Sequence, residues 1–341
     1  MTRYLSGRLL GAAATVLGVS IIAFMLLRVL PGDPVRLALG RLASQDAVDA
    51  QRIHMGLDQP LVVQYWRYIT DFFSGNWGFA YSMGAPTQDL IVQRLPATVE
   101  LGVVAFVLAF VAALFAVLIS TYRRRPWLDS TVRGVAYVGL GTPPFWFALL
   151  LLLLFSQQLA IFPGPEGRLS AFAAPPPHVT GLYLVDSLLV LDFATFGDAL
   201  LHLVLPAIAL GFAPFALLTR ILRANMLETS RDPFVVVARS LGNGRWRAHT
   251  HHVLPNAFLP TLTISGILLA ELLVGSVLIE RIFGWPGVGA LAIDAISRQE
   301  YSVIQVFILL SAVGYVLVNV LVDVLSSLID PRIRTQLGAA R

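Results

Sequence analysis

The 341-residue sequence contains no cysteine and no lysine, and all 24 of its basic residues are arginine. Without cysteine, the chain has no disulfide, no thiolate nucleophile and no thiolate metal ligand. Without lysine, it lacks the P-loop side chain that contacts the β- and γ-phosphates of ATP, and it cannot form a Schiff base. We therefore expect a chain that is not an enzyme, has no cofactor of its own and hydrolyses no ATP.

Charged residues are also scarce. They make up 13% of the chain, whereas 57% of the residues are hydrophobic, and soluble domains average about 25% charged. The net charge of +4 does not indicate nucleic acid, because the arginines are dispersed among short segments between apolar runs. This composition predicts an all-α integral membrane protein.

Six apolar runs are long enough to cross the hydrocarbon core, which takes ~20 helical residues. They cover about residues 9–30, 97–121, 134–155, 199–223, 253–279 and 302–329. Prolines interrupt the third run at Pro143 and Pro144 and the fourth at Pro206 and Pro214. We expect kinks there, since neighbouring helices can satisfy the freed carbonyl groups.

The arginines predict the orientation of these spans. If both termini are cytoplasmic, the inner segments hold 15 of the 24 arginines, as the positive-inside rule requires. Residues 31–96 then form an extracytoplasmic insertion, which is rich in aromatic residues and long enough for a small packed subdomain. Residues 161–197 form a second external loop, whose first part is rich in proline and glycine.

One inner segment, residues 232–252, has the pattern of a short amphipathic helix. Asp232 and Pro233 are typical of a helix start, and Gly242 followed by Asn243 and Gly244 predicts its end. Apolar residues recur between these limits with the spacing of one helical face, namely Phe234, Val237, Ala238 and Leu241. Such a helix can lie on lipid headgroups or dock to a cytosolic partner.

The spacing within this segment resembles the coupling motif of ABC-importer permeases. That motif is Glu-Ala-Ala, three residues, Gly, nine residues, and Ile-x-Leu-Pro. Ala238, Gly242 and Leu254–Pro255 occupy the matching positions, whereas Val236 and Val237 replace Glu-Ala and His252 replaces Ile.

Further strings extend the resemblance along about 90% of the chain, in the order found in the dipeptide/oligopeptide/nickel branch of these permeases. They are LLRVLPGDP, GLDQP, SGNWG, RLPATVELG, TPPFWFALLLLLLF, HLVLPAIAL, ERIFGWPGVGALAIDAISRQEY and VNVLVDVLSSLIDPRIR. The long first external insertion is typical of one of the two permease subunits in that branch.

The resemblance implies a type I ABC importer permease fold in the bacterial cytoplasmic membrane. It implies a homologous second permease, two cytosolic ATPases (or one dual ATPase chain) that bind ATP and Mg, and an external substrate-binding protein. It also implies that the ATPases dock on Phe234, Val236, Val237, Ala238, Leu241 and Gly242. Di- and oligopeptides are the expected substrates, with nickel or glutathione as alternatives within the family and a secondary transporter as the alternative class.

Polar residues inside the apolar runs are candidate functional groups, because each charge there costs ~2.5–3.5 kcal/mol on insertion scales. Glu271 lies near the middle of the fifth run, where it can line the substrate pathway or bond to another helix; both interpretations stay open. Asp323, one turn after Asn319, favours a structural contact between helices. Trp285, in RIFGWPGVG, can contact the binding protein, close a gate or pack in the core.

The sequence argues against a metal site, a nucleotide-binding loop and an intramembrane protease. His249, His251 and His252 have no carboxylate or thiolate nearby in sequence, so we predict contacts with a partner or phosphate and no metal site. Gly284, Gly287 and Gly289 follow no predicted strand, which favours a turn over a nucleotide-binding loop. The rhomboid GxSG motif is incomplete in TISG at 263–266, which argues against an intramembrane protease.

Overall fold

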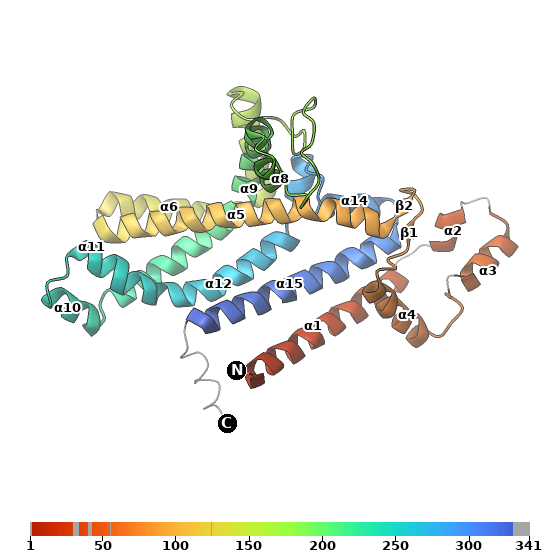
Figure 1. Ribbon diagram of the computed structural model, residues 1–341, viewed down its shortest axis with the longest axis horizontal. Coiled ribbons are helices and arrows are strands. Elements are labelled where there is room, and N and C mark those ends of the chain that lie inside the picture. Colours follow the sequence, from red (N-terminus) through yellow and green to blue (C-terminus); the bar gives the residue numbers. More distant parts are fainter. Residues whose placement is uncertain (1, 30–33, 40–42, 55, 124, 330–341) are drawn as a thin grey trace.

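The structure is a computed structural model that describes residues 2–29, 34–39, 43–54, 56–123 and 125–329 (Figure 1). It is almost entirely helical. The first half of the chain contains α1 (Thr2–Val29), α2 (Pro34–Leu39), α3 (Gln45–His54), α4 (Leu61–Ser74), β1 (Phe79–Ala80), β2 (Ala85–Pro86), α5 (Thr87–Arg123), α6 (Pro126–Gly141), α7 (Pro144–Leu151) and the π-helix η1 (Leu152–Gln158).

The second half begins after an irregular connection. It contains α8 (Tyr183–Leu189), α9 (Phe193–Thr229), α10 (Pro233–Ser240), α11 (Arg245–Ala248), the π-helix η2 (His249–Val253), α12 (Leu254–Val274), α13 (Val277–Ile282), α14 (Val288–Ser297) and α15 (Tyr301–Ile329).

The long helices α1, α5, α9, α12 and α15 form the bundle (Figure 1). Small residues let α5 and α9 approach closely: a Cβ added at Gly211 would lie 2.7 Å from the carbonyl oxygen of Ala105. The largest buried cluster joins α5, α7 and α9 to the segment after α12, and it includes Leu101, Leu203 and Trp285.

Within the described part of the chain, four helical segments are long and apolar enough to cross a membrane: Thr87–Arg123, Phe193–Thr229, Arg245–Val274 and Tyr301–Val322. They contain most of four of the predicted runs. Their ends differ from the predicted ones. α5 begins at Thr87 instead of residue 97, and α12 ends at Val274 instead of residue 279. The first run lies in α1, whose apolar stretch is Leu10–Met25.

The predicted run 134–155 is not one helix that is merely kinked. It bends by 110° between α6 and the α7–η1 segment. The break is at Thr142 and Pro143, because two consecutive prolines remove two backbone donors and drive the residue before them out of the helical region. Thr142 is extended accordingly, with ψ of 121°. Pro206 and Pro214, by contrast, lie inside the continuous helix α9.

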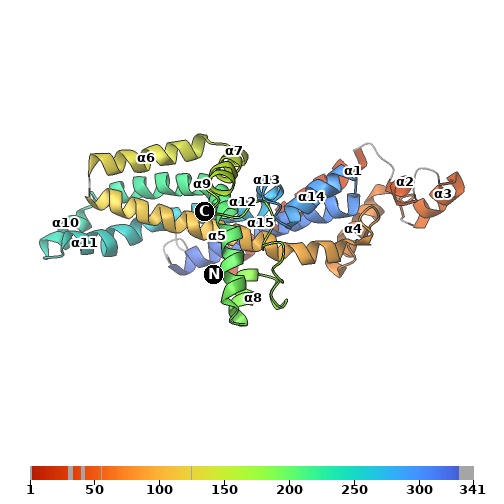
Figure 2. The same ribbon diagram turned by 90° about the horizontal axis from the view of Figure 1, so that it is seen from above.

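The region from α7 to α8 projects sideways from the bundle (Figures 1 and 2). Its connection is irregular, as the proline and glycine content of 161–197 predicted, but residues 193–197 already belong to α9.

The insertion folds into helices and a hairpin at one end of the bundle. Phe24 of α1 packs edge-on against Tyr65 of α4, with 5.4 Å between ring centroids. Phe72 stacks on Trp77 at 5.7 Å, and both pack against a cluster that includes Val303 of α15. The insertion is therefore joined to the bundle through α4 and the hairpin.

The insertion and α10–α11 lie at opposite ends of the molecule (Figures 1 and 2). The start of α1 and the end of α15 both lie toward the α10–α11 side of its middle. Three of the 15 arginines assigned to the inner segments lie outside the described residues, namely Arg332, Arg334 and Arg341.

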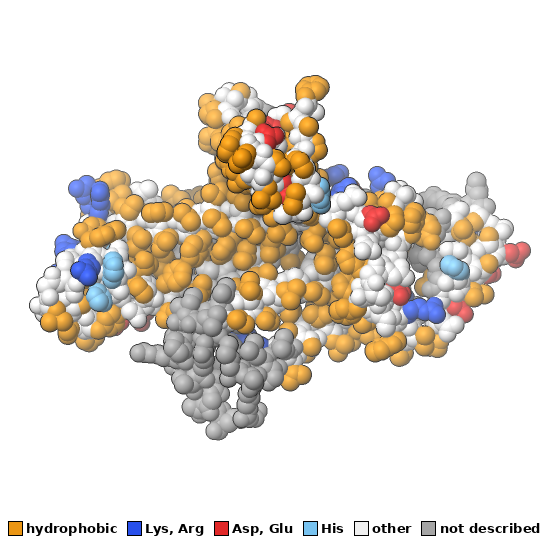
Figure 3. Space-filling model, in the orientation of Figure 1, with side chains coloured by type: hydrophobic (Ala, Val, Ile, Leu, Met, Phe, Trp, Pro, Cys, Tyr) orange, Lys and Arg blue, Asp and Glu red, His pale blue; other side chains and the backbone are white. Residues whose placement is uncertain are grey.

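On the face drawn in Figure 3, the bundle is apolar along its length, and charged side chains gather toward its two ends. Exposed apolar side chains include Val103, Val107, Phe115 and Ile119 of α5 and Leu317 and Leu321 of α15. Such a surface favours contact with lipid tails or with another membrane subunit.

Candidate functional site: the coupling segment and the opposite end

Helix α10 occupies the first half of the predicted coupling segment, and α11 and η2 follow in its second half. Pro233 begins it, although the Asp232 side chain at the N-cap accepts no capping hydrogen bond. The predicted stop is confirmed: Gly242 has φ of 89°, and the Asn243 backbone N–H donates to the Ala238 carbonyl at 3.3 Å. Only glycine adopts this left-handed conformation without steric cost.

The outer face of α10 is apolar and unprotected in the isolated chain. Phe234, Val237 and Leu241 are 41%, 56% and 79% exposed, and Val236 is exposed beside them. Ala238, which the spacing predicted on the same face, is buried. The exposed apolar face of this segment therefore consists of Phe234, Val236, Val237 and Leu241, with Gly242 at its end.

The inner face of α10 anchors the segment to the bundle. Val235 packs in a cluster with Val117 of α5, Met226 of α9 and Val253 of η2. A second anchor is the 3.0 Å hydrogen bond between Thr121 Oγ1 and His249 Nε2. The segment is thus packed against α5, α9 and the start of α12.

The three histidines do not gather around one point. His249 bonds to Thr121, and His251 Nδ1 bonds to the neighbouring Thr250 hydroxyl. Within the described ranges, no group of three or more His, Cys, Asp or Glu side chains is placed to hold a metal ion.

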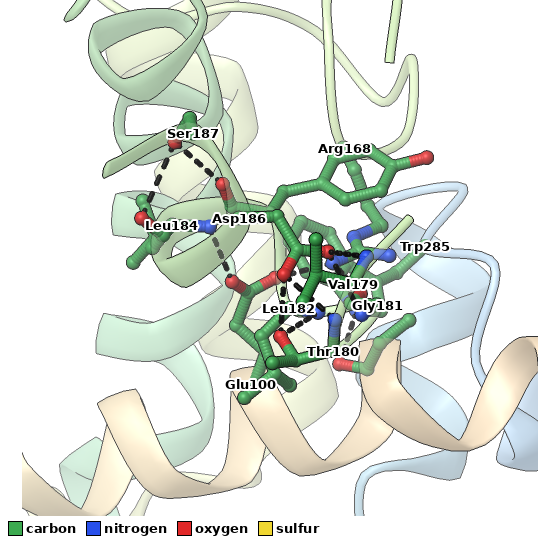
Figure 4. A network of polar contacts seen from close by, with 12 residues as sticks. Glu100, Arg168, Val179, Thr180, Gly181, Leu182, Leu184, Asp186, Ser187 and Trp285 are labelled. Carbon is green, nitrogen blue, oxygen red and sulfur yellow. Dashed lines mark hydrogen bonds and ion pairs between the residues drawn. The ribbon is translucent and has the colours of Figure 1, made fainter. Parts of the chain in front are cut away.

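Toward the other end of the bundle, a buried ion pair fixes the irregular loop that precedes α8. Arg168 Nη2 lies 2.6 Å from Glu100 Oε2, and both side chains are almost fully buried (Figure 4). The same nitrogen donates to the Gly181 carbonyl at 2.9 Å, and Glu100 also accepts from the Leu184 backbone N–H. The guanidinium lies 3.4 Å from the centre of the Tyr183 ring.

Asp186 holds the adjacent turn of the loop (Figure 4). Its carboxylate accepts hydrogen bonds from the backbone of Val179, Thr180 and Gly181 and from the Thr180 hydroxyl. Burial raises the pKa of this carboxyl, but the hydrogen bonds outweigh burial and hold the pKa below its usual value.

Trp285 lies in the core beside this network. It is 1% exposed, its indole N–H donates to the Ala97 carbonyl at 2.8 Å, and the Arg168 guanidinium lies 5.9 Å from its ring centre. This position supports the packing role over contact with a binding protein or a substrate.

Of the three predicted intramembrane polar residues, Glu271 and Asn319 have described side chains. Glu271 lies in the last turn of α12, not near mid-span, and its side chain is exposed in the isolated chain. Asn319 donates to the Tyr315 carbonyl of its own helix at 2.8 Å. The side chain of Asp323 lies outside the described residues.

Sequence reasoning missed Glu100, Arg168 and Glu280 as members of buried networks. Glu100 carried a usable signal, since it is a third acidic residue inside an apolar run. Arg168 and Glu280 lie in connecting segments, where a charged residue gives no indication of burial.

The sequence matches two parts of one family along nearly its whole length. Residues 1–102 match the N-terminal "Binding-prot-dependent transport system membrane comp", and residues 105–335 match the "Binding-protein-dependent transport system inner membrane component".

Individual relatives agree with this match. The chain is 40% identical to the probable D,D-dipeptide transport system permease protein DdpB of Escherichia coli K12, over 95% of both chains. It is 39% identical to the di/tripeptide transport system permease protein DppB of Pseudomonas aeruginosa, over 98% of this chain and 100% of the relative. It is 35% identical to the dipeptide permease DppB of Alkalihalophilus pseudofirmus, over 98% and 100%. The chain therefore belongs to the inner-membrane component family of binding-protein-dependent transport systems, the multi-pass permeases of ABC importers.

Proposed function

We propose that this chain is one of two permease subunits of an ATP-driven importer of di- and oligopeptides. Support comes from near full-length similarity to three permeases whose names specify dipeptides or tripeptides. Those names favour peptides over nickel or glutathione. An external binding protein delivers the peptide, and partner ATPases bind ATP and Mg.

The exposed face of α10 carries the coupling part of this proposal. Phe234, Val237 and Leu241 form an apolar patch at the end of the bundle that the arginine distribution assigns to the cytoplasm. A groove on an ATPase that accepts this helix removes the patch from water. Because Val235 and His249 fix the segment to α5, α9 and α12, movement of the ATPase then moves the bundle.

Glu271 is our candidate for the substrate pathway. Its exposed carboxylate lies on an otherwise uncharged helix, and no hydrogen bond or ion pair with the described residues compensates it. A charged group in such a position faces a water-filled cavity or a partner subunit. We place it on the pathway between the two permeases, where it can offset the amino terminus of a peptide.

The Val237→Glu substitution tests the coupling role. An unpaired charge in a buried apolar contact costs several kcal/mol, on the order of the desolvation of an ion in a protein. We expect fewer ATPase subunits to co-purify with the variant permease and peptide uptake to be lost, while the variant still inserts and binds the partner permease.

Ser130→Glu is the matched control, because Ser130 is exposed at the same end of the bundle on α6. It adds the same charge outside the coupling segment and should retain both ATPases and uptake. Full ATPase retention and uptake in Val237→Glu would place the coupling surface elsewhere.

A further inference from the structure

A cavity of about 280 Å³ lies between the coupling segment and the ends of α5 and α9. Its polar lining comes from Thr121 and Tyr122 of α5, Ser230 after α9, Arg239 of α10, Arg245 of α11 and His249 of η2. These residues belong to five different parts of the chain, so the cavity exists only when the coupling segment is seated on the bundle.

The lining is cationic and rich in hydroxyl groups. It includes two guanidinium groups and one imidazole, but no Asp or Glu among the described residues. Across the described part of the chain, the side chains of Arg239 and Arg245 make no hydrogen bond or ion pair. Both charges are therefore free to bind an anion.

The cavity faces away from the docking surface. Arg239 follows Val235 by four residues and shares its inward face of α10, whereas Phe234, Val237 and Leu241 point outward. A ligand in the cavity and a partner on the outer face would contact opposite sides of the same helix.

We propose that this cavity binds the phosphate group of an anionic ligand. Planar guanidinium groups bind phosphate oxygens through paired N–H donors, and the Tyr122 hydroxyl supplies a further donor. The Thr121 and Ser230 hydroxyls donate to the Val117 and Leu227 carbonyls. The ligand is either the headgroup of an anionic phospholipid, since the candidate membrane span Arg245–Val274 begins at this cavity, or a soluble phosphate compound. The bound phosphate links α10 and α11 to α5 and α9 and stiffens the coupling segment.

The test uses the complete purified importer in nanodiscs. One arm compares nanodiscs of phosphatidylcholine alone with nanodiscs that also contain phosphatidylglycerol, and a second arm adds inorganic phosphate to phosphatidylcholine nanodiscs. The readouts are the apparent affinity from thermal stabilisation and the number of retained phosphatidylglycerol molecules by native mass spectrometry.

The test variant carries both Arg239→Gln and Arg245→Gln. The control is Arg247→Gln, since Arg247 lies on α11 with Arg245 but does not line the cavity. Loss of two charge-assisted hydrogen bonds should weaken binding by about tenfold or more. The wild type and the control should bind equally. All three arginines are exposed, so folding should be retained, and Arg245→Gln alone provides a milder variant.

A response to phosphatidylglycerol alone identifies a lipid headgroup, and a response to inorganic phosphate identifies a soluble ligand. If neither probe binds the wild type, or if the double variant binds as well as Arg247→Gln, the proposal is wrong.

Discussion

The Thr98 hydroxyl donates a 2.7 Å hydrogen bond to the carboxylate of Glu280, and the two residues are 182 positions apart in the chain. Glu280 is fully buried and also accepts from the Ser276 hydroxyl at 2.7 Å and the Ala290 backbone N–H at 2.8 Å. Thr98 in turn accepts from the Val288 N–H at 2.8 Å. The Thr98 hydroxyl thus joins α5 to α13 through Glu280 and to the start of α14 through Val288.

Replacement of Thr98 by valine should destabilise the protein markedly. Valine keeps the shape, but it removes a donor from a buried carboxylate and an acceptor from a buried N–H, and each unsatisfied group costs about 1–3 kcal/mol. Thr98→Ser, which keeps the hydroxyl, should be much milder. Thermal unfolding of the purified complex checks this, and equal midpoints for the two variants would contradict it.

The ion pair between Arg168 and Glu100 should behave as a coupled unit. Arg168→Met leaves the Glu100 carboxylate buried with only the Leu184 N–H as donor, and breaking one side of a buried pair costs about 3–5 kcal/mol. In the double variant with Glu100→Gln, part of that stability should return because the isolated charge is gone. A double-mutant cycle on thermal stability measures the coupling, and additive effects would show that the pair is not coupled.

The sequence predicted the features that depend on local patterns. The apolar runs identified the long helices, and the positions of Pro233 and Gly242 identified the start and stop of α10. These signals work because helix ends and apolar lengths are set by a few adjacent residues.

The 110° bend before α7 depends on what the α7–η1 segment packs against. The positions of the prolines in the sequence do not contain that information. Pro143 breaks a helix, whereas Pro206 lies within one that continues.

The glycines of RIFGWPGVG also depend on tertiary contacts that the local sequence does not show. We predicted a turn because no strand precedes them, but two of these glycines are required by a tertiary contact. A Cβ on Gly287 would lie 2.3 Å from the Glu280 carboxyl carbon, and one on Gly289 would lie 2.8 Å from a carboxylate oxygen. These glycines make room for a buried acid that periodicity does not reveal.

Glu271→Gln should reduce uptake of peptides with a free amino terminus without loss of assembly. The substitution keeps the shape of the side chain and removes the charge that we assign to the pathway. Glu228→Gln removes an exposed acid near the C-terminal end of α9 and serves as the control. Transport by the reconstituted complex, with free and N-acetylated peptides, is the measurement; an unchanged preference in Glu271→Gln would remove this residue from the pathway.

Single cysteines in this cysteine-free chain should show which end of the bundle is external. Ser82 lies in the turn between β1 and β2, Ser240 is the last residue of α10, and both are exposed. They lie at opposite ends of the bundle, and the arginine distribution assigns the Ser82 end to the outside. A membrane-impermeant maleimide should therefore label the Ser82→Cys variant in intact spheroplasts. The Ser240→Cys variant should react only after the membrane is ruptured. The opposite pattern would reverse the orientation that the arginines predict, and with it the cytoplasmic placement of the docking face on α10.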